Sequence, residues 1–454
     1  MQSDQFQQLV LRYNKPVPRY TSYPTVPVWK EGIDQQQYIQ LLQQQFQFHN
    51  QKEGISFYIH LPFCESLCTY CGCNKKITTN HGVEVEYLEI IEKEFELYLS
   101  ILHNKPVIRE LHLGGGTPTF FSPANLERLM HFITERSVVH PHHEFSIEGH
   151  PNNTTREHLE TLYTLGFRRV SYGVQDNDPE VQRIINRIQP IENVRRATAD
   201  AREIGFESVN YDLIYGLPKQ SLESITRTIQ QVVELRPDRI AFYSYAHLPS
   251  AFPAQKTYSS HLPNEQEKRA LYELGKELLI EMGYEEIGMD HFALPNEPLF
   301  IAKQEGKLHR NFMGYTTLAS KMLIGLGASS ISDVWIGFAQ NEKKVESYEE
   351  ALTHYQIPVV KGHALTSEDL EVRTLILNLI CKGESEIPES IWSQIPTDHL
   401  NQLHAMVNEG LIELEGKHLK ITNDGMAVVR NICSLFDLKM MNQSQKKVSF
   451  SKAI

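Results

Sequence analysis

The sequence has 454 residues, of which 41% are hydrophobic and 22% charged, and its formal net charge at pH 7 is −12. A chain of this length exceeds one compact core, so we expect two domains and a terminal extension. The negative charge argues against general binding to nucleic acids or membrane surfaces, but it leaves room for a local basic pocket that binds an anionic ligand.

The sequence contains no pattern of a secretion signal or a membrane span. Its first residues lack a basic region followed by an apolar one. The most apolar short run, residues 375–380, is far shorter than the roughly 20 residues that a spanning helix needs. We therefore expect a cytoplasmic protein, in which disulfide bonds are not expected.

Residues 1–54 are predicted to form an N-terminal extension. Within it, residues 19–25 are too rich in Tyr and Pro for a helix, whereas apolar side chains recur at helical spacing over residues 35–48. Residues 19–25 are either a tail packed on the surface or a lid that covers a carboxylate-bearing substrate with Arg19 and Tyr20.

Strands and helices alternate from about residue 55 to residue 246. The predicted strands span residues 55–61, 109–113, 144–148, 169–174, 208–214 and 239–245. Helices are predicted at residues 83–102, from Ser122 onwards, up to Gly166, and as a pair that ends at Gly205. This alternation predicts a parallel sheet covered by helices, without deciding between an open sheet and a barrel.

The regular alternation of strands and helices is not continued in the remaining sequence. Residues 263–282 are predicted to be a helix, and residues 284–345 show no clear pattern. A small domain follows, with predicted helices near 366–381 and 398–409, a hairpin at 411–422, and a last helix to about residue 438. We interpret it as a docking or lid domain, because the surrounding charge does not support binding of nucleic acid.

Four of the six cysteines, Cys64, Cys68, Cys71 and Cys73, fall within ten positions. A structural zinc site normally takes two ligand pairs from separate turns, and no second pair is present in the sequence. Three thiolates on one short loop can instead hold three irons of a [4Fe-4S] cluster and leave the fourth iron open. Zinc or a redox dithiol is the alternative.

Unusual residues also stand at the ends of the predicted strands. They are Gly114, Gly115 and Gly116, then Glu148, Gln175 and Asp212, and finally Tyr245, Ala246 and His247. Ligands of parallel α/β proteins bind at the carboxyl ends of strands, so these residues and the cysteine loop are expected on one face. Taken singly, Asp212 is equally a structural carboxylate and the glycines a tight turn.

The C-x3-C-x2-C spacing resembles the signature of the radical S-adenosylmethionine (SAM) enzymes. More specifically, the sequence resembles the oxygen-independent coproporphyrinogen III oxidases of that superfamily. The resemblance rests on residues 19–25, residues 58–64 with Cys73, and further stretches at 114–119, 212–219 and 309–312, up to 430–433. It covers nearly the whole chain. His150 is a departure, because an acidic residue is usual there.

The resemblance implies an α/β fold: an incomplete (β/α)6 barrel with its extension over residues 55–362, and a small, mainly helical domain over residues 363–454. It implies an oxidoreductase of haem biosynthesis. Such an enzyme decarboxylates the ring A and B propionates of coproporphyrinogen III to the vinyl groups of protoporphyrinogen IX through a 5′-deoxyadenosyl radical.

The resemblance also implies the roles of individual residues. Cys64, Cys68 and Cys71 would hold the cluster, whereas Cys73 would contact the cofactor and act in catalysis with Tyr58, Arg19 and Tyr20. The SAM on the cluster would contact Tyr58, Gly115, Glu148 and Ile331. A second SAM would contact Tyr70, Gly116, Thr117, Gln175, Arg187, Asp212 and Ala246. The alternative for Arg187 and Asp212 is a structural salt bridge.

The implied partners are coproporphyrinogen III, a reducing electron donor such as flavodoxin or ferredoxin, and an electron acceptor that the sequence does not identify; the chain is expected to be a monomer. Alternatives are a radical enzyme that opens the porphyrin ring and a haem chaperone without catalysis. Chaperone-like relatives usually lack the equivalents of Cys73 and of the Tyr-rich stretch, and both are present here. A zinc-stabilised α/β binding module is the third possibility.

Overall fold

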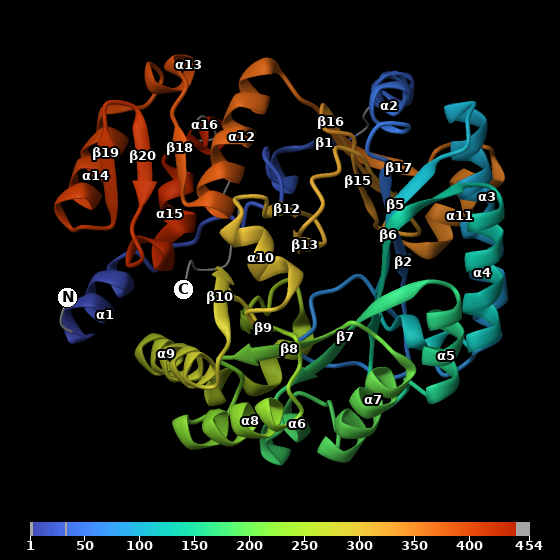
Figure 1. The fold of residues 1–454 in the computed structure, drawn as a ribbon, viewed down its shortest axis with the longest axis horizontal. Coiled ribbons are helices and arrows are strands. Elements are labelled where there is room, and N and C mark those ends of the chain that lie inside the picture. The colour runs from blue at the N-terminus through green and yellow to red at the C-terminus, as the bar shows by residue number, and fades with distance from the viewer. Residues whose placement is uncertain (1–2, 32–33, 442–454) are drawn as a thin grey trace.

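Seven parallel strands form the centre of the molecule (Figure 1). The computed structural model describes residues 3–31 and 34–441. In sheet order the strands are β14 (Leu323–Leu326), β2 (Ile55–Leu61), β5 (Val107–Gly115), β6 (Val138–Gly149), β7 (Phe167–Gln175), β8 (Ser208–Tyr215) and β9 (Arg239–Ser244). Parallel pairing from β2 to β9 confirms the sheet predicted over residues 55–246.

Six βα units follow one another along the chain, with their helices outside the curved sheet (Figure 1). The helices are α3 (Val83–Leu102), α4 (Pro123–Glu135), α5 (Arg156–Thr164), α6 (Pro179–Ile184) with α7 (Ile191–Ile204), α8 (Leu222–Glu234) and α9 (Glu265–Glu281). Ser122 caps α4 by accepting a hydrogen bond from the Asn125 amide. Gly205 ends α7 with a φ of +112°, which favours glycine.

The sheet does not close into a ring. Beyond β9 it continues with antiparallel β11 (His291–Ala293) and β10 (Glu285–Gly288), and beyond β14 with β15 (Ile331–Asp333), β16 (Gly337–Asn341), β17 (Val359–Ala364) and β1 (Lys30–Glu31). The edge strands β1 and β10 do not pair with each other. The architecture is therefore the incomplete barrel that the resemblance implied.

Shorter elements complete this part of the molecule. They are η1 (Val26–Val28), α2 (Gln35–His49), β3 (Phe63–Cys64), β4 (Lys76–Ile77), η2 (Pro118–Phe120), η3 (Pro253–His261), α10 (Pro298–Gln304), β12 (His309–Asn311), β13 (Gly314–Thr316) and α11 (Val345–Thr353). The helix predicted over residues 35–48 is confirmed as α2. Within the described residues, no helix is long and apolar enough to cross a membrane.

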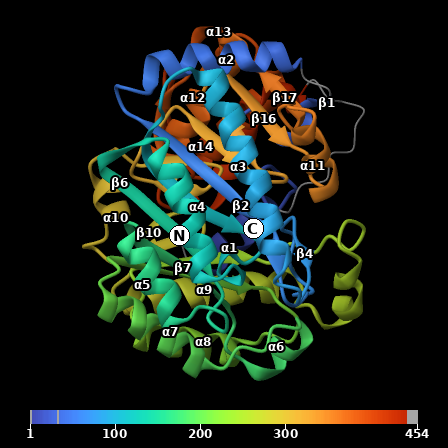
Figure 2. The same ribbon diagram turned by 90° about the vertical axis from the view of Figure 1, so that its right-hand side faces the viewer.

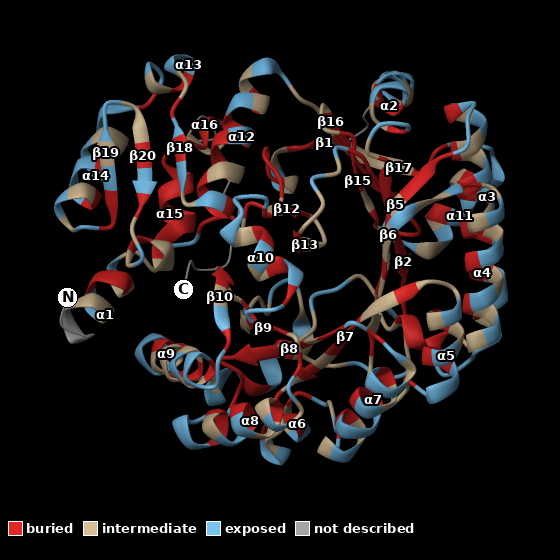
Figure 3. Ribbon diagram, in the orientation of Figure 1, coloured by how far each residue is buried: buried red, intermediate tan, exposed pale blue. Residues whose placement is uncertain are grey.

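Side chains on the parallel strands alternate between two environments. Phe57, Ile59 and Leu61 of β2 belong to the buried hydrophobic core that the strands share with the helices (Figure 3). The interior of the barrel is polar instead, and its lining includes His112, Glu148, Arg169, Asn210 and Asp212. The period of two along each strand thus separates the residues that stabilise the fold from those available for chemistry.

The C-terminal part packs around a second hydrophobic core. Its elements are α12 (Ser367–Lys382), β18 (Glu384–Glu386), α13 (Glu389–Trp392), α14 (Thr397–Asn408), β19 (Ile412–Glu415), β20 (His418–Ile421), η4 (Gly425–Val428), α15 (Val429–Ser434) and α16 (Leu438–Met441). The predicted hairpin is confirmed, with Glu415 opposite His418. The single helix predicted to about residue 438 is wrong, because Asp437 accepts a hydrogen bond from the Met440 amide and starts a new helix.

The N-terminal segment, which begins with α1 (Ser3–Arg12), runs between the barrel and the C-terminal part. Arg430 donates to the carbonyls of Val17 and Pro18. Tyr20 and Tyr23 are each 2% exposed and belong to the second core. Residues 19–25 are therefore not a surface tail. The boundaries at residues 54/55 and 362/363 stay a prediction.

Candidate active site

A cavity of 760 Å³ lies at the carboxyl ends of the parallel strands. Among the residues predicted for the site, its lining contains Cys64, Cys68, Tyr70, Cys71, Cys73, Gly115, Gly116, Thr117, Glu148, Gln175, Arg187 and Asp212. These residues come from the cysteine loop after β2, from the ends of four more strands, and from the segment after α6. The structure therefore brings together on one face most of the residues that the sequence predicted there.

The cysteine loop is tied down at both ends and along its length. At its base, the Lys76 amide donates to the Pro62 carbonyl at 2.8 Å. In its middle, the Thr69 amide donates to the Ile185 carbonyl at 3.0 Å, and the Lys75 ammonium donates to the Cys71 carbonyl at 3.0 Å. A loop held in this way presents its thiols in a fixed arrangement before any ligand binds.

The four thiols differ in their surroundings. Thr117 donates to Cys64 Sγ at 3.3 Å, and Arg187 donates to Cys68 Sγ at 3.5 Å. A hydrogen bond from Cys73 lowers the pKa of Cys71 to about 6, and the same contact raises the pKa of Cys73. Burial also raises the pKa of Cys64, so these pKa shifts do not separate the three expected cluster ligands from Cys73.

The described side chains of the cysteine loop are not arranged as the ligands of a single metal ion. Among residues 3–31 and 34–441, no three His, Cys, Asp or Glu side chains converge as the ligands of one metal ion would. In a [4Fe-4S] cluster each thiolate binds a different iron, so the sulfurs stand farther apart than around one tetrahedral zinc. Cys64, Cys68 and Cys71 are partly exposed toward one cavity, as cluster ligands must be.

The run of three glycines lets β5 approach the stem of the cysteine loop. A Cβ on Gly116 would lie 2.5 Å from the Pro62 carbonyl oxygen, and one on Gly115 would lie 2.7 Å from the His60 ring. Gly115 also has a φ of +118°, which other residues rarely adopt. The glycines are thus required by close packing against the loop that carries the thiols.

Glu148 is an ionised carboxylate at the centre of the cavity wall. It accepts hydrogen bonds from the Gly115 amide at 3.1 Å and is 3.3 Å from His112 Nε2. Burial alone would raise the pKa of Glu148, but the bonds from His112 and Gly115 outweigh burial and lower that pKa. A negative charge here suits a cationic amino group.

Arg187 and Asp212 face the same cavity without an ion pair between them. Arg187 donates to the Gly173 carbonyl and to Cys68, and its Nε atom is buried with no partner among the described residues. Asp212 accepts from Ser171 and Asn210, and burial raises its pKa to about 7. Both groups therefore keep hydrogen-bonding capacity for a ligand. They do not form the structural salt bridge that was the alternative.

His150 lines the cavity where an acidic residue was expected. Burial, followed by the charge of Arg187, lowers the pKa of His150 to about 2, so the imidazole is neutral. A carboxylate at this position would compete for Arg187, whereas a neutral ring leaves the guanidinium charge to a ligand.

Comparisons with known proteins agree with this geometry. Residues 58–232 match the family described as the radical SAM superfamily. The chain is 38% identical to the oxygen-independent coproporphyrinogen III oxidase of Escherichia coli, covering 98% of both chains, and 38% identical to that of Pseudomonas aeruginosa, covering 97% of both. The solved structure of the Escherichia coli oxidase, described as a radical SAM enzyme, matches with a TM-score of 0.86 at 37% identity and covers 93% of this chain and 100% of that chain.

The chain belongs to the oxygen-independent coproporphyrinogen III oxidase family. Membership of the radical SAM superfamily confirms the two kinds of cofactor that were expected, a [4Fe-4S] cluster and SAM. The thiols, the carboxylates and the guanidinium that line the 760 Å³ cavity are suited to bind these two cofactors.

Three of the residues expected to contact SAM, Tyr58, Ala246 and Ile331, are not among those that line the cavity. Tyr58 packs within 5.9 Å of the His112 ring and bonds to His60 Nδ1 at 3.1 Å. The Ala246 carbonyl accepts from Gln255 at 3.4 Å, and Ile331 begins β15. Their predicted contacts with SAM stay a prediction.

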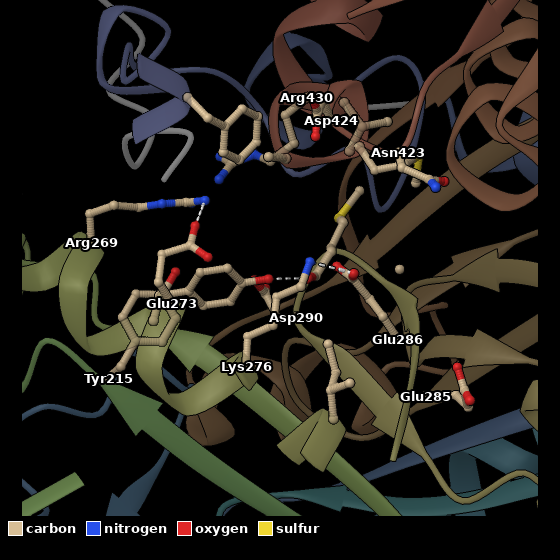
Figure 4. A pocket seen from close by; sticks show the side chains of 18 of the residues that line it. Tyr215, Arg269, Glu273, Lys276, Glu285, Glu286, Asp290, Asn423, Asp424 and Arg430 are labelled. Carbon is tan, nitrogen blue, oxygen red and sulfur yellow. Dashed lines mark hydrogen bonds and ion pairs between the residues drawn. The ribbon is translucent and has the colours of Figure 1, made fainter. Parts of the chain in front are cut away.

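A second cavity, of 450 Å³, lies between α9, β10 and the C-terminal part (Figure 4). Arg19 is among the residues that line it. It pairs with Asp290 at 3.0 Å, and its guanidinium lies 5.7 Å from the centre of the Tyr243 ring. Tyr243 in turn lines the cavity that holds the thiols, so one aromatic ring separates Arg19 from it. Tyr20 lines neither cavity and donates its hydroxyl hydrogen to Asp437 at 3.2 Å.

Sequence reasoning missed several polar residues of the oxidase site. His60 bonds to the Asn74 carbonyl at 2.9 Å and so fixes the end of the cysteine loop, while His112 supports Glu148. Asn210 holds both Ser171 and Asp212. The alternation along each strand could have indicated them, because every second side chain points into the barrel and these residues stand at such positions.

Proposed function

We propose that this protein catalyses the oxygen-independent oxidative decarboxylation of the ring A and B propionates of coproporphyrinogen III, giving the vinyl groups of protoporphyrinogen IX. The observation that carries the proposal is one cavity that unites a three-thiol loop, an ionised Glu148, and the ligand-directed side chains of Arg187 and Asp212. Membership of the oxidase family supports it.

Cys64, Cys68 and Cys71 would hold the cluster. Tyr58, Gly115, Glu148 and Ile331 would bind the SAM on the cluster, and Tyr70, Gly116, Thr117, Gln175, Arg187, Asp212 and Ala246 a second SAM. When bound, these cofactors supply a 5′-deoxyadenosyl radical, which can take a hydrogen atom from a propionate β-carbon that has no acidic proton.

The protein's own residues bind, orient and exclude water. The carboxylate of Glu148 is suited to the amino group of SAM, and the guanidinium of Arg187 to a carboxylate. Asp212 is suited to accept hydrogen bonds from ribose hydroxyls, since its present partners leave acceptor positions free. Loss of one hydrogen atom, one electron and CO2 per propionate then completes each vinyl group.

The substrate carries a propionate on each pyrrole ring, so its recognition needs cations. Arg19 is our candidate, because it lines the second cavity and contacts Tyr243, which lines the first. We further propose that residues 55–362 form the catalytic unit, that residues 1–54 cover the substrate and that residues 363–454 form a docking or lid domain. The enzyme would work as a monomer with a separate electron donor and acceptor.

An anaerobic assay with coproporphyrinogen III, SAM and a strong chemical reductant tests the proposal. We expect the product mass to fall by one CO2 and two hydrogens for each of two rings, and the Cys64→Ala variant to give none of it. An unchanged substrate would overturn the proposal. A ring-opened product, or stable haem binding without turnover, would instead establish one of the two haem-handling alternatives.

A further inference from the structure

A locally positive surface lies where the cysteine loop reaches the outside of the protein. Gly72 and Cys73 are exposed, and the half-buried Lys75 and the exposed Lys76 follow after Asn74. The side chain of Asn74 donates to the Lys343 carbonyl at 2.9 Å, which brings the segment before α11 beside the loop. Both β4 and α11 lie on the side that faces the viewer in Figure 2.

This surface contains four lysines, Lys75, Lys76, Lys343 and Lys344, against the two glutamates Glu342 and Glu346. Lys76 pairs with Glu346 at 2.6 Å. Lys343 and Lys344 are exposed, and within the described part of the chain neither forms an ion pair. A positive patch on a chain with a net charge of −12 is a local exception, and it lies at the end of the loop that carries the thiols.

The position of these two lysines is unfavourable for the helix that follows them. Lys344 stands at the N-cap of α11 and makes no capping hydrogen bond with its side chain. The positive end of the helix dipole disfavours cations there. Apart from a favourable charge interaction between Lys344 and Glu346, the described residues give the side chains of Lys343 and Lys344 no partner. An acidic protein would therefore find an attractive surface beside the cluster loop.

We propose that Lys75, Lys76, Lys343 and Lys344 form the docking surface for an acidic one-electron carrier protein. The inference rests on the proposed function, which needs an electron from outside the chain. The carrier is oxidised by one electron and the cluster is reduced by one, while no covalent bond forms or breaks. Docking at the exposed end of the loop places the carrier beside the thiols that would hold the cluster.

The test compares two double variants of equal charge change. K343E/K344E reverses the charge of two lysines of the patch. K52E/K105E is the control and reverses the charge of two exposed lysines in the loops before β2 and β5, at the opposite end of the strands. Oxidised flavodoxin and oxidised ferredoxin serve as probes of binding to the anaerobically reconstituted enzyme at low ionic strength. Neither variant alters a residue that we assign to the cofactors.

We expect K343E/K344E to weaken binding of at least one carrier by about tenfold, and salt to weaken wild-type binding, because the contact is electrostatic. K52E/K105E should stay within about twofold of wild type, since its charges are far from the contact. Cluster reduction by the reduced carrier should slow in K343E/K344E, while reduction by dithionite should not change.

Three results would overturn the proposal: neither carrier binds the wild-type enzyme, both double variants bind equally, or K343E/K344E raises the KM for coproporphyrinogen III with dithionite as reductant. The last result would mean that the patch attracts the anionic substrate. Failure of the proposed function is distinguishable, because no vinyl product would then form with dithionite in any variant.

Discussion

Cys73 lies two residues beyond Cys71 and bonds to it, yet we predict opposite consequences for the loss of these two thiols. Replacement of Cys64, Cys68 or Cys71 by Ala removes one iron ligand, so the protein should lose most of its roughly four irons per chain. Cys73→Ala should keep the iron and lose vinyl formation. Iron and acid-labile sulfide analysis measures this, and an iron-free Cys73→Ala protein would show that the ligand set is misassigned.

Asp212 makes binding of the second SAM dependent on pH. Its pKa of about 7 means that the carboxyl group loses acceptor capacity below pH 7 and recovers it above. Equilibrium dialysis should give about two SAM equivalents at pH 8. At pH 6 the affinity for the second SAM, which Asp212 would bind, should be up to about tenfold lower. Asp212→Asn should bind about one equivalent at both pH values with unchanged iron content. If the wild type bound only one SAM equivalent at pH 8, the prediction of two bound SAM molecules would be wrong.

At the scale of elements, a buried carboxylate joins α3 to the end of β14 and to β16. Glu94 is fully buried and accepts hydrogen bonds from the Gly327 amide at 2.7 Å and from Asn341 at 2.6 Å. Burial raises its pKa from 4.5 to about 7. The folded protein keeps a proton that the unfolded chain loses above pH 4.5, so this group's contribution to stability falls as the pH rises from about 4.5 to about 7.

Glu94→Gln should remove that dependence. Between pH 5 and pH 8 the free energy of unfolding of the wild type should fall relative to the variant by about 2–3 kcal/mol, since one pKa unit corresponds to about 1.4 kcal/mol. Urea unfolding at both pH values measures the difference, and Glu96→Gln, on the exposed face of α3, is the control. An identical pH profile in the Glu94 variant and the wild type would contradict the assignment.

At the scale of the whole molecule, the N-terminal segment packs in the second core, and its Arg19 lies against Tyr243, which lines the active-site cavity. Arg19→Gln should lower vinyl formation by about tenfold or more, because it removes a charged contact with carboxylate. Iron content and SAM cleavage without substrate should not change. Arg12→Gln, in the same segment but on the surface beside Glu409, is the control. If the Arg19 and Arg12 variants formed equal amounts of vinyl product, the assignment of Arg19 to substrate binding would be wrong.

Point substitution is the better probe here, because deletion of residues 1–30 would also take Tyr20 and Tyr23 out of the second core. The carbonyls of Arg19 and Tyr20 accept hydrogen bonds from Arg310, at 2.8 and 3.0 Å. Loss of the segment would therefore leave Arg310 buried without these partners, a cost to the whole fold rather than to the substrate site alone.

The sequence by itself determined what depends on neighbours along the chain. The spacing of Cys64, Cys68 and Cys71 expresses the chemistry of one loop, and the alternation of strands and helices follows from local periodicity. Because parallel strands present their carboxyl ends on one face, the sharing of a cavity by Glu148 and Asp212 also followed from that alternation.

Only the tertiary structure decided what depends on contacts between distant segments. The short strand β14 lies beside β2 although more than 250 residues separate them, and its four residues carry too little periodicity to be read. The pairing of Arg19 with Asp290, and of Tyr20 with Asp437, required the N-terminal segment to pack against distant elements of the second core. Such contacts leave no pattern in the sequence, since their free energy comes from packing between elements whose order along the chain does not fix their positions in space.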